Sequence, residues 1–309
     1  MLAVALATKD NLTRITNFMK SKLWLIYALI TTLSWGIWGA FIGLPTENGF
    51  PETLVYCVWA ITMIPPAFIV LKLVDWKLQY DKKSILFGSI IGLFGAGGQL
   101  ILFHAVKIGP AHLIFPIISL SPVITIVLSM LLLKERTGKL GALGILLALV
   151  SLPLLNYSGG GEGVDQNFLW FVLAILVLAA WGVQAFFMKL ANETMQAESI
   201  FFYMMLSGLL LIPVALVMTD FTADINWGAN GPYLAGGIQI LNSLGALALV
   251  FAFRYGKAIV VSPLTNAGAP LITSVIAIVI LGVMPNTTII IGICFAVIAA
   301  LLLAIDSEE

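Results

Sequence analysis

The sequence predicts an all-α membrane protein with ten transmembrane helices, arranged as two inverted five-helix repeats. Three observations carry this prediction: the composition, the number of long apolar stretches, and the recurrence of the first half of the chain in the second. Of the 309 residues, 61% are hydrophobic and only 10% are charged, and the mean hydropathy is +1.07. A soluble domain carries about 25% charged residues, so this composition excludes an ordinary soluble protein.

Ten apolar stretches have about the 20 residues that a helix needs to cross the hydrocarbon core of a bilayer. In the first repeat, residues 23–156, the expected spans are 23–44, 53–71, 84–106, 112–133 and 138–156. In the second repeat, residues 168–305, they are 168–190, 199–218, 231–254, 259–282 and 286–305. Residues 157–167 are the expected outer linker, and residues 1–22 and 306–309 are the expected cytoplasmic tails.

Turn residues and charges separate these spans. Residues 72–83 mix both signs of charge and form the longest inner loop. Ile-Gly-Pro at 108–110 leaves room only for a tight helical hairpin, and Ser-Gly-Gly-Gly at 158–161 marks the flexible linker between the repeats. The loop at 219–231 carries Asp220 and Asp224 on the outer side.

Residues of the first half recur in the second half at a nearly constant offset. The matched pairs, at offsets of 146, 147 and 148 positions, are Trp35 with Trp181, Pro116 with Pro263, and Pro122 with Pro270. A repeated unit with an odd number of spans must enter the membrane from opposite sides in its two copies. Inverted repeats of this kind are typical of secondary transporters, which hold their substrate near the membrane midplane. The matched prolines are candidate hinge points, although proline is also common in static membrane helices.

The positions of the basic residues predict the orientation. With the N-terminus inside, 14 of the 15 Lys and Arg residues fall in cytoplasmic segments, and Lys107 alone falls outside. Because Lys and Arg near span ends are retained in the cytoplasm, we expect both termini there, in a cell inner membrane.

The spans contain neutral polar residues but no carboxylate, because all fifteen Asp and Glu residues fall in loops, tails or at span ends. Polar residues inside a membrane should face protein or a cavity rather than lipid. The candidate substrate-binding residues are Trp35, Trp38, Gln99, Ser121, Trp181, Gln184, Asn242 and Asn266. For Ser121 the alternative is a hydrogen bond to its own helix, and for the tryptophans it is ordinary packing.

Three ionisable residues have proposed roles in coupling and gating. His104 is the candidate for any proton coupling, because its unperturbed pKa of about 6.5 lies near working pH. It follows Gln99 by five residues, about 140° around the helix, so the two should not line one surface. Lys107 and Arg254 are repeat mates at span ends and could capture an anionic group at each gate, or extend toward the lipid headgroups. Without another titratable interior group, we expect facilitated diffusion or exchange.

Residues 105–135 carry a recognisable pattern: Ala-Val-Lys-Ile-Gly-Pro-Ala at 105–111, Pro116 and Pro122, and Leu-Leu-Leu-Lys-Glu at 131–135. This pattern resembles the drug/metabolite transporter superfamily, EamA type, whose members end the fourth span with a Leu-rich run and a Glu. The resemblance implies two inverted five-helix halves around a central cavity. The second half departs from the pattern because Val283 stands at the place of Glu135. We therefore expect no role for Glu135 that is common to both halves, and we expect it to cap span four among inner-loop charges.

The function indicated is a secondary active or facilitative transporter of a small polar metabolite, amino acid-like or similar, working by alternating access. The alternative is a monosaccharide porter of the same superfamily, because Trp with Gln and Asn would suit a sugar ring. An intramembrane enzyme would need a nucleophile with a base, or a metal site, and two His, two isolated Cys and no embedded carboxylate do not supply one. A channel would need a continuous polar stripe or filter loop. The expected partners are a small-molecule substrate and the lipid bilayer, with no nucleic acid, no metal and no cofactor, in a monomer or weak dimer.

Overall fold

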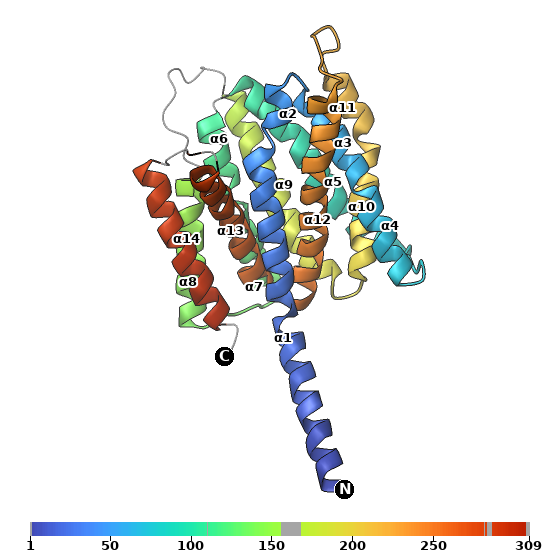
Figure 1. The fold of residues 1–309 in the computed structure, drawn as a ribbon, viewed down its shortest axis with the longest axis vertical. Coiled ribbons are helices and arrows are strands. Elements are labelled where there is room, and N and C mark those ends of the chain that lie inside the picture. Colours follow the sequence, from blue (N-terminus) through green and yellow to red (C-terminus); the bar gives the residue numbers. More distant parts are fainter. Residues whose placement is uncertain (1, 110, 156–167, 281, 283–285, 307–309) are drawn as a thin grey trace.

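The computed structural model describes residues 2–109, 111–155, 168–280, 282 and 286–306, and every regular element within these residues is a helix (Figure 1). The helices of the first repeat are α1 (Leu2–Phe41), α2 (Leu44–Glu47), α3 (Glu52–Thr62), α4 (Ile64–Leu73), α5 (Lys82–Ile108), α6 (Ala111–Ile118), α7 (Ser121–Leu132) and α8 (Lys139–Leu155). Those of the second are α9 (Leu169–Ala191), α10 (Ala197–Leu210), α11 (Ile212–Met218), η1 (Ala229–Tyr233), α12 (Leu234–Tyr255), α13 (Ala258–Val279) and α14 (Thr287–Asp306).

Within the described ranges, seven helical segments are long and apolar enough to cross a membrane. They are Lys22–Glu47, Glu52–Leu73, Lys82–Ile108, Leu169–Ala191, Ala197–Met218, Ala229–Tyr255 and Ala258–Ile276. Three shorter apolar helices accompany them: Ser121–Leu132, Lys139–Leu155 and Thr287–Leu303. A multi-pass helical membrane protein is therefore supported, and the count of ten spans stays a prediction.

Proline explains three breaks within the expected spans. The broken pairs are α3–α4, α6–α7 and α10–α11. In each case the helix after the break has a proline in its first turn: Pro65 in α4, Pro122 in α7 and Pro213 in α11. A proline is tolerated there because its missing N–H is not needed in the first turn. One matched pair differs, however: Pro116 and Pro263 both lie inside helices, α6 and α13, but Pro122 stands in the first turn of α7 whereas Pro270 lies inside α13.

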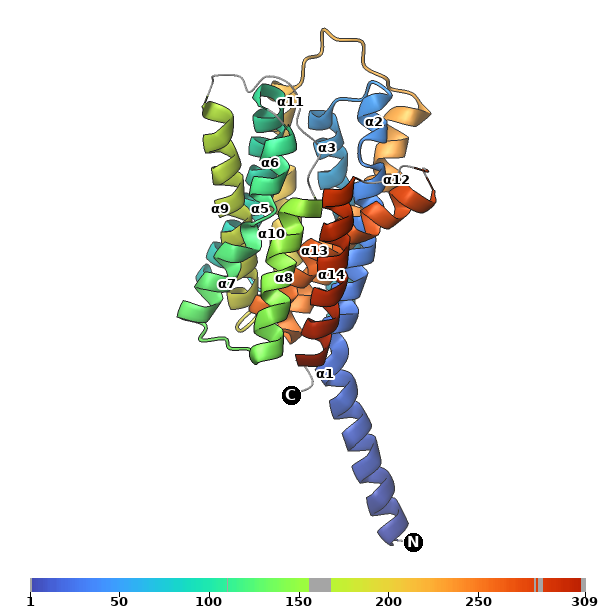
Figure 2. The ribbon, with the colours of Figure 1, turned by 90° about the vertical axis from the view of Figure 1, so that its left-hand side faces the viewer.

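Helices α1 and α9, the first helices of the two repeats, run in opposite directions (Figure 2). An added Cβ at Gly256, in the turn between α12 and α13, would lie 2.9 Å from the Cβ of Trp24 in α1. The same turn receives the end of α9, where Lys189 Nζ donates to the Gly256 carbonyl at 2.6 Å. At the repeat-related turn between α5 and α6, a Cβ at Gly109 would lie 2.2 Å from the Cβ of Trp170, at the start of α9.

A second contact also recurs at the repeat offset. Thr273 Oγ1 of α13 donates to the Gly36 carbonyl of α1 at 2.9 Å. Thr125 Oγ1 of α7, 148 positions before Thr273, donates to the Gly182 carbonyl of α9 at 3.0 Å. Corresponding helices of the two halves therefore make corresponding contacts.

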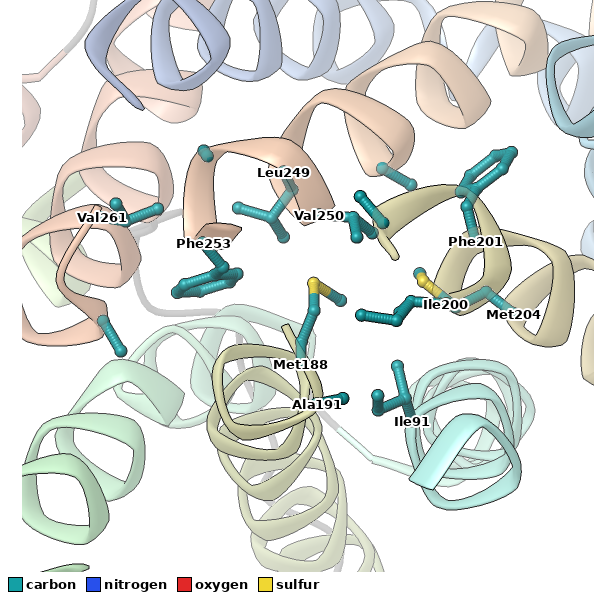
Figure 3. Close-up of a cluster of buried hydrophobic side chains, with 14 of the residues drawn as sticks. Ile91, Met188, Ala191, Ile200, Phe201, Met204, Leu249, Val250, Phe253 and Val261 are labelled. Atoms are coloured by element: carbon teal, nitrogen blue, oxygen red, sulfur yellow. The ribbon is translucent and has the colours of Figure 1, made fainter. Parts of the chain in front are cut away.

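The largest buried apolar cluster joins helices of both halves (Figure 3). It brings Ile91 of α5 together with Met188 of α9, Ile200 of α10 and Phe253 of α12, all at most 1% exposed. Outside this core, large apolar side chains are widely exposed, as a lipid-facing surface requires.

Helix α1 extends well beyond the bundle at its N-terminal end, as Figures 1 and 2 show. Residues 2–21, assigned from the sequence to an N-terminal tail, continue this helix. We call the end of the bundle from which α1 projects the α1 end, and the opposite one the linker end, because α8 stops and α9 starts there.

Candidate functional site

A cavity of about 570 Å³ lies in the centre of the bundle and is partly open. Its wall comes from helices of both repeats, including α1, α5, α9, α12 and α13. The lining reaches Ile42 and Leu155, near the linker end, and Met188 and Leu249, which belong to the buried apolar cluster of Figure 3. The volume falls within the range of about 300–1,000 Å³ that is usual for small-molecule sites.

All eight residues proposed from the sequence line this cavity: Trp35, Trp38, Gln99, Ser121, Trp181, Gln184, Asn242 and Asn266. They come from six different helices and from both halves of the chain. The structure thus brings them to one site, and their contact with a substrate stays a prediction.

Trp35 and Trp181 are held by equivalent hydrogen bonds. The indole N–H of Trp35 donates to the Asn242 carbonyl at 3.2 Å, and that of Trp181 donates to the Gly95 carbonyl at 3.3 Å. Asn242 follows Gly95 by 147 positions, so these bonds are repeat mates. Because each N–H is already bound to the backbone, the two indoles are held in fixed orientations and offer the cavity mainly apolar ring surface.

Two small residues make room for these indoles. A Cβ at Gly98 would lie 2.6 Å from Trp181 Nε1, and a Cβ at Gly245 would lie 2.5 Å from Trp35 Cδ1. Gly98 and Gly245 are again 147 positions apart. Packing and cavity lining are therefore not alternatives for these tryptophans, since each ring does both.

A buried amide orients two further lining residues. Gln239 is 3% exposed, and its Oε1 accepts from Trp38 Nε1 and from Asn242 Nδ2, both at 3.2 Å. Asn266 is bound within its own helix, where Nδ2 donates to the Ser262 carbonyl at 2.9 Å. The side-chain oxygens of Asn242 and Asn266 accept no hydrogen bond from the described part of the protein, so they remain available to a ligand.

Gln99 and Gln184 make no side-chain hydrogen bond within the described residues, and both are half-buried. An amide carries two donors and an acceptor. Gln184 also lies directly against the backbone of α5, because a Cβ at Gly95 would come within 2.2 Å of its Nε2. These two amides are the side chains best placed to bind a hydroxyl or carbonyl group of a ligand.

No charged side chain lines the cavity among the residues that the structure describes. His104 is exposed on α5, and the helical geometry that separates it from Gln99 is as expected. Lys107 is exposed in the last turn of α5. Arg254 lies at the other end of the bundle, where its Nη1 donates to the Met195 carbonyl at 3.2 Å. The proposed coupling and gate residues are thus outside the cavity.

Several lining residues were not among those proposed from the sequence. Trp59, Phe115 and Thr273 all line the cavity. Thr273 is the repeat mate of Thr125, 148 positions earlier, so the repeat offset could have identified it. The two aromatic residues carry no such signal, since an aromatic residue in a span is usually packed against other helices or lipid.

The sequence matches the EamA-like transporter family over residues 22–157 and 168–305. Over 78 residues it is 33% identical to uncharacterized protein MJ1333.1 of Methanocaldococcus jannaschii, covering 25% of this chain and 57% of that protein. Over 158 residues it is 27% identical to protein LicB of Haemophilus influenzae, covering 46% and 49% respectively. The chain thus spans about half the length of each of these relatives. A solved crystal structure shares the fold with a TM-score of 0.73 at 18% identity, covering 90% of this chain and 98% of the other.

Proposed function

The chain belongs to the EamA-like transporter family, and from that premise we propose that it carries a small polar metabolite across the cytoplasmic membrane by alternating access. The observation that carries the proposal is the central cavity of about 570 Å³, walled by both halves and lined by indole and amide groups. A cavity of this kind at the interface of two repeats is where secondary transporters bind their substrate.

We propose that the two inverted halves of the protein exchange their conformations during transport. The recurring contacts support it: Trp35 and Trp181 bind equivalent carbonyls, and Thr273 and Thr125 bind Gly36 and Gly182 in the same way. Helix α1 passes the turn between α12 and α13 at Trp24, where α9 ends, and α9 starts at the turn between α5 and α6 at Trp170, so a contact at one end of the bundle has its counterpart at the other. Such halves can open the cavity first to one side and then to the other.

We propose that the α1 end is cytoplasmic and that the linker end faces outside. The distribution of Lys and Arg, 14 of 15 in segments assigned to the inside, supports this orientation. In the structure, exposed Lys107 lies near the linker-end loop, where its charge contributes to lowering the pKa of Asp220, an effect due mainly to the hydrogen bond from Thr222.

The two candidate substrate classes differ in the charges that they would bring into the cavity. A zwitterionic amino acid brings an ammonium and a carboxylate, and each of these needs a charged or strongly polar partner once removed from water. No charged side chain lines the cavity in the described residues. A monosaccharide has no net charge, its apolar ring face can lie on an indole, and its hydroxyls can pair with amide groups. We therefore rank a monosaccharide or similar uncharged, hydroxylated solute ahead of an amino acid.

The test is a ligand panel on the purified protein, followed by uptake into proteoliposomes. We expect neutral sugars or polyols to raise the melting temperature, since a ligand at 100 times its Kd adds about 2.7 kcal/mol to the folded state. Amino acids and phosphorylated sugars should not. The Gln184→Ala variant, which removes a free amide from the cavity wall, should lose the shift. Stabilisation by charged ligands alone would refute the neutral substrate class.

We also propose that transport is facilitative or an exchange, because no titratable side chain lines the cavity in the described part of the chain. A pH gradient across proteoliposomes is therefore expected to leave the initial uptake rate within about twofold, since a proton can drive a carrier only by binding its states differently. Any proton dependence should disappear in His104→Gln. Strong acceleration by the gradient that persists in His104→Gln would contradict this proposal.

A further inference from the structure

Two opposite charges lie almost buried at the α1 end of the bundle. Lys189, in the last turn of α9, and Glu135, just after α7, are 17% and 9% exposed, and Nζ lies 3.9 Å from Oε1. By contrast, the Lys77–Asp75 pair is 73% and 86% exposed, as is usual for a surface pair. Removing two charges from water is unfavourable unless other groups compensate, so each charge requires further polar partners.

Each of the two charges binds the end of a different helix. Lys189 Nζ donates to the Phe253 carbonyl at 3.1 Å and to the Gly256 carbonyl at 2.6 Å, at the C-terminal end of α12. Glu135 Oε2 accepts from the backbone N–H of Ile259 at 3.1 Å, in the first turn of α13. A helix is partially negative at its C-terminus and partially positive at its N-terminus, so each charge meets the opposite sign.

Glu135 does more than cap span four, where its backbone N–H donates to the Ser129 carbonyl of α7 at 3.2 Å. Its carboxylate reaches the first turn of a helix in the other half of the chain. Together, the two side chains bind both sides of the turn between α12 and α13, which we call the α12–α13 turn (residues 253–259).

This turn lies beneath the cavity. Met188, next to Lys189, lines the cavity, and so does Ser262, three residues after Ile259. Phe253 and Val261, on either side of the turn, belong to the apolar cluster of Figure 3, which also contains the cavity-lining Met188 and Leu249. The turn and the apolar cluster thus lie on the side of the cavity that faces the α1 end.

The opposite end of the bundle has no equivalent charges at the repeat-related positions. Gly43 stands 146 positions before Lys189, and Val283 stands 148 positions after Glu135. In the sequence, therefore, neither a cation nor an anion stands at the positions that would bind the repeat-related turn between α5 and α6. The α1 end of the bundle thus has an ion pair for which the sequence provides no equivalent at the linker end.

We propose that Lys189 and Glu135 form a latch on the α12–α13 turn that holds the cytoplasmic end shut, so that the empty carrier rests open to the outside. The proposal rests on the orientation and the alternating access proposed above. Both residues are gate residues: they act through the position of α12 and α13, without touching substrate. Substrate entry from outside would then precede release of the latch.

The test measures access to the cavity and requires no substrate. Ala185 lines the cavity one helical turn from Lys189, and Ala185→Cys is introduced after Cys57 and Cys294 are replaced by alanine. Labelling by a membrane-impermeant maleimide is compared in right-side-out and inside-out vesicles. With the latch intact, labelling should be fast from outside and slow from inside. Lys189→Met and Glu135→Gln should each raise the inside rate about tenfold, because a hydrogen bond to a charged group is lost.

A charge exchange separates the latch from a simple ion pair. In Glu135→Lys with Lys189→Glu, the carboxylate would face the carbonyls of α12 and the ammonium the N–H of α13, so closure should not be restored. Lys72→Met, at an exposed lysine in the last turn of α4, is the matched control and should label like the parent. Fast labelling from outside in every variant shows that the fold and the cavity are intact.

Two results would overturn the proposal. Equal inside labelling of the parent, Lys189→Met and Glu135→Gln would show that the pair does not hold the turn. Restored closure in the charge exchange would show that the helix ends play no part. If the labelling rates change as expected but proteoliposomes show no uptake, that result counts against the proposed function alone.

Discussion

Alanine at Gly36 or at Gly182 is expected to destabilise the protein strongly, and by similar amounts. A Cβ at Gly36 would lie 2.4 Å from the Cβ of Ile272, and a Cβ at Gly182 would lie 2.6 Å from the Cβ of Ile124. In both places a backbone carbonyl is also too close, at 3.1 Å for Gly36 and 2.7 Å for Gly182. Because helices rather than side-chain tips must move, we expect a loss of about 1–3 kcal/mol, or roughly 5 °C in melting temperature.

The matched control for these variants is Gly97→Ala. An added Cβ at Gly97, on α5, meets nothing within 4 Å. Alanine stabilises a helix relative to glycine by about 1 kcal/mol, so this variant should melt at or above the temperature of the parent. Thermal unfolding in detergent, followed by tryptophan fluorescence, provides the measurement. Identical melting of Gly36→Ala, Gly182→Ala and Gly97→Ala would refute the close contacts of α1 with α13 and of α9 with α7.

Gly95→Ala is expected to weaken substrate binding strongly without loss of stability. Its Cβ would lie 2.2 Å from Nε2 and 2.9 Å from Cδ of Gln184. These atoms are the end of a flexible side chain, so the amide should swing aside while the helices stay in place. If Gln184 binds substrate as proposed, the displaced amide should weaken binding about tenfold or more. The measurements are the ligand-induced melting shift and uptake into proteoliposomes.

A double mutant gives this prediction its control. Gly95→Ala in a Gln184→Ala background removes the clash, because the amide is gone. The combined variant should therefore bind no worse than Gln184→Ala alone, a strong departure from additivity. Additive losses would mean that Gly95→Ala acts elsewhere, for example through the carbonyl that binds Trp181. Normal binding by Gly95→Ala would exclude Gln184 from the substrate site.

The sequence was sufficient to identify the cavity wall because the membrane limits where polar groups can lie. Gln99, Gln184, Asn242 and Asn266 stand in spans where lipid cannot bind them, so they must face protein or a cavity, and all four line the same cavity. The repeat offset was equally informative, because Trp35 and Trp181 make matching hydrogen bonds. Membership of the EamA-like family confirms the resemblance drawn from residues 105–135.

Features that depend on contacts between distant helices could not be predicted in this way. Lys189 and Glu135 each look like a loop charge at a span end, and only the packing of α7 and α9 against the α12–α13 turn makes them partners. In the sequence, Gln239 is likewise one polar residue among several. Only the packed structure shows that it is buried between Trp38 and Asn242.

The unequal treatment of the matched prolines has a mechanical consequence. Helix α13 continues past Pro263 and Pro270, whereas the corresponding segment of the first half is divided between α6 and α7, with Ser119 and Leu120 at the junction. A proline inside a helix removes one backbone hydrogen bond and allows a bend there while the helix stays continuous. Two helices separated by a junction can instead change their relative angle at the junction. The cavity wall of the second half can therefore bend only within one helix, at its prolines, whereas that of the first half can bend between two helices. Two repeats of similar sequence thus give the cavity two walls with different flexibility.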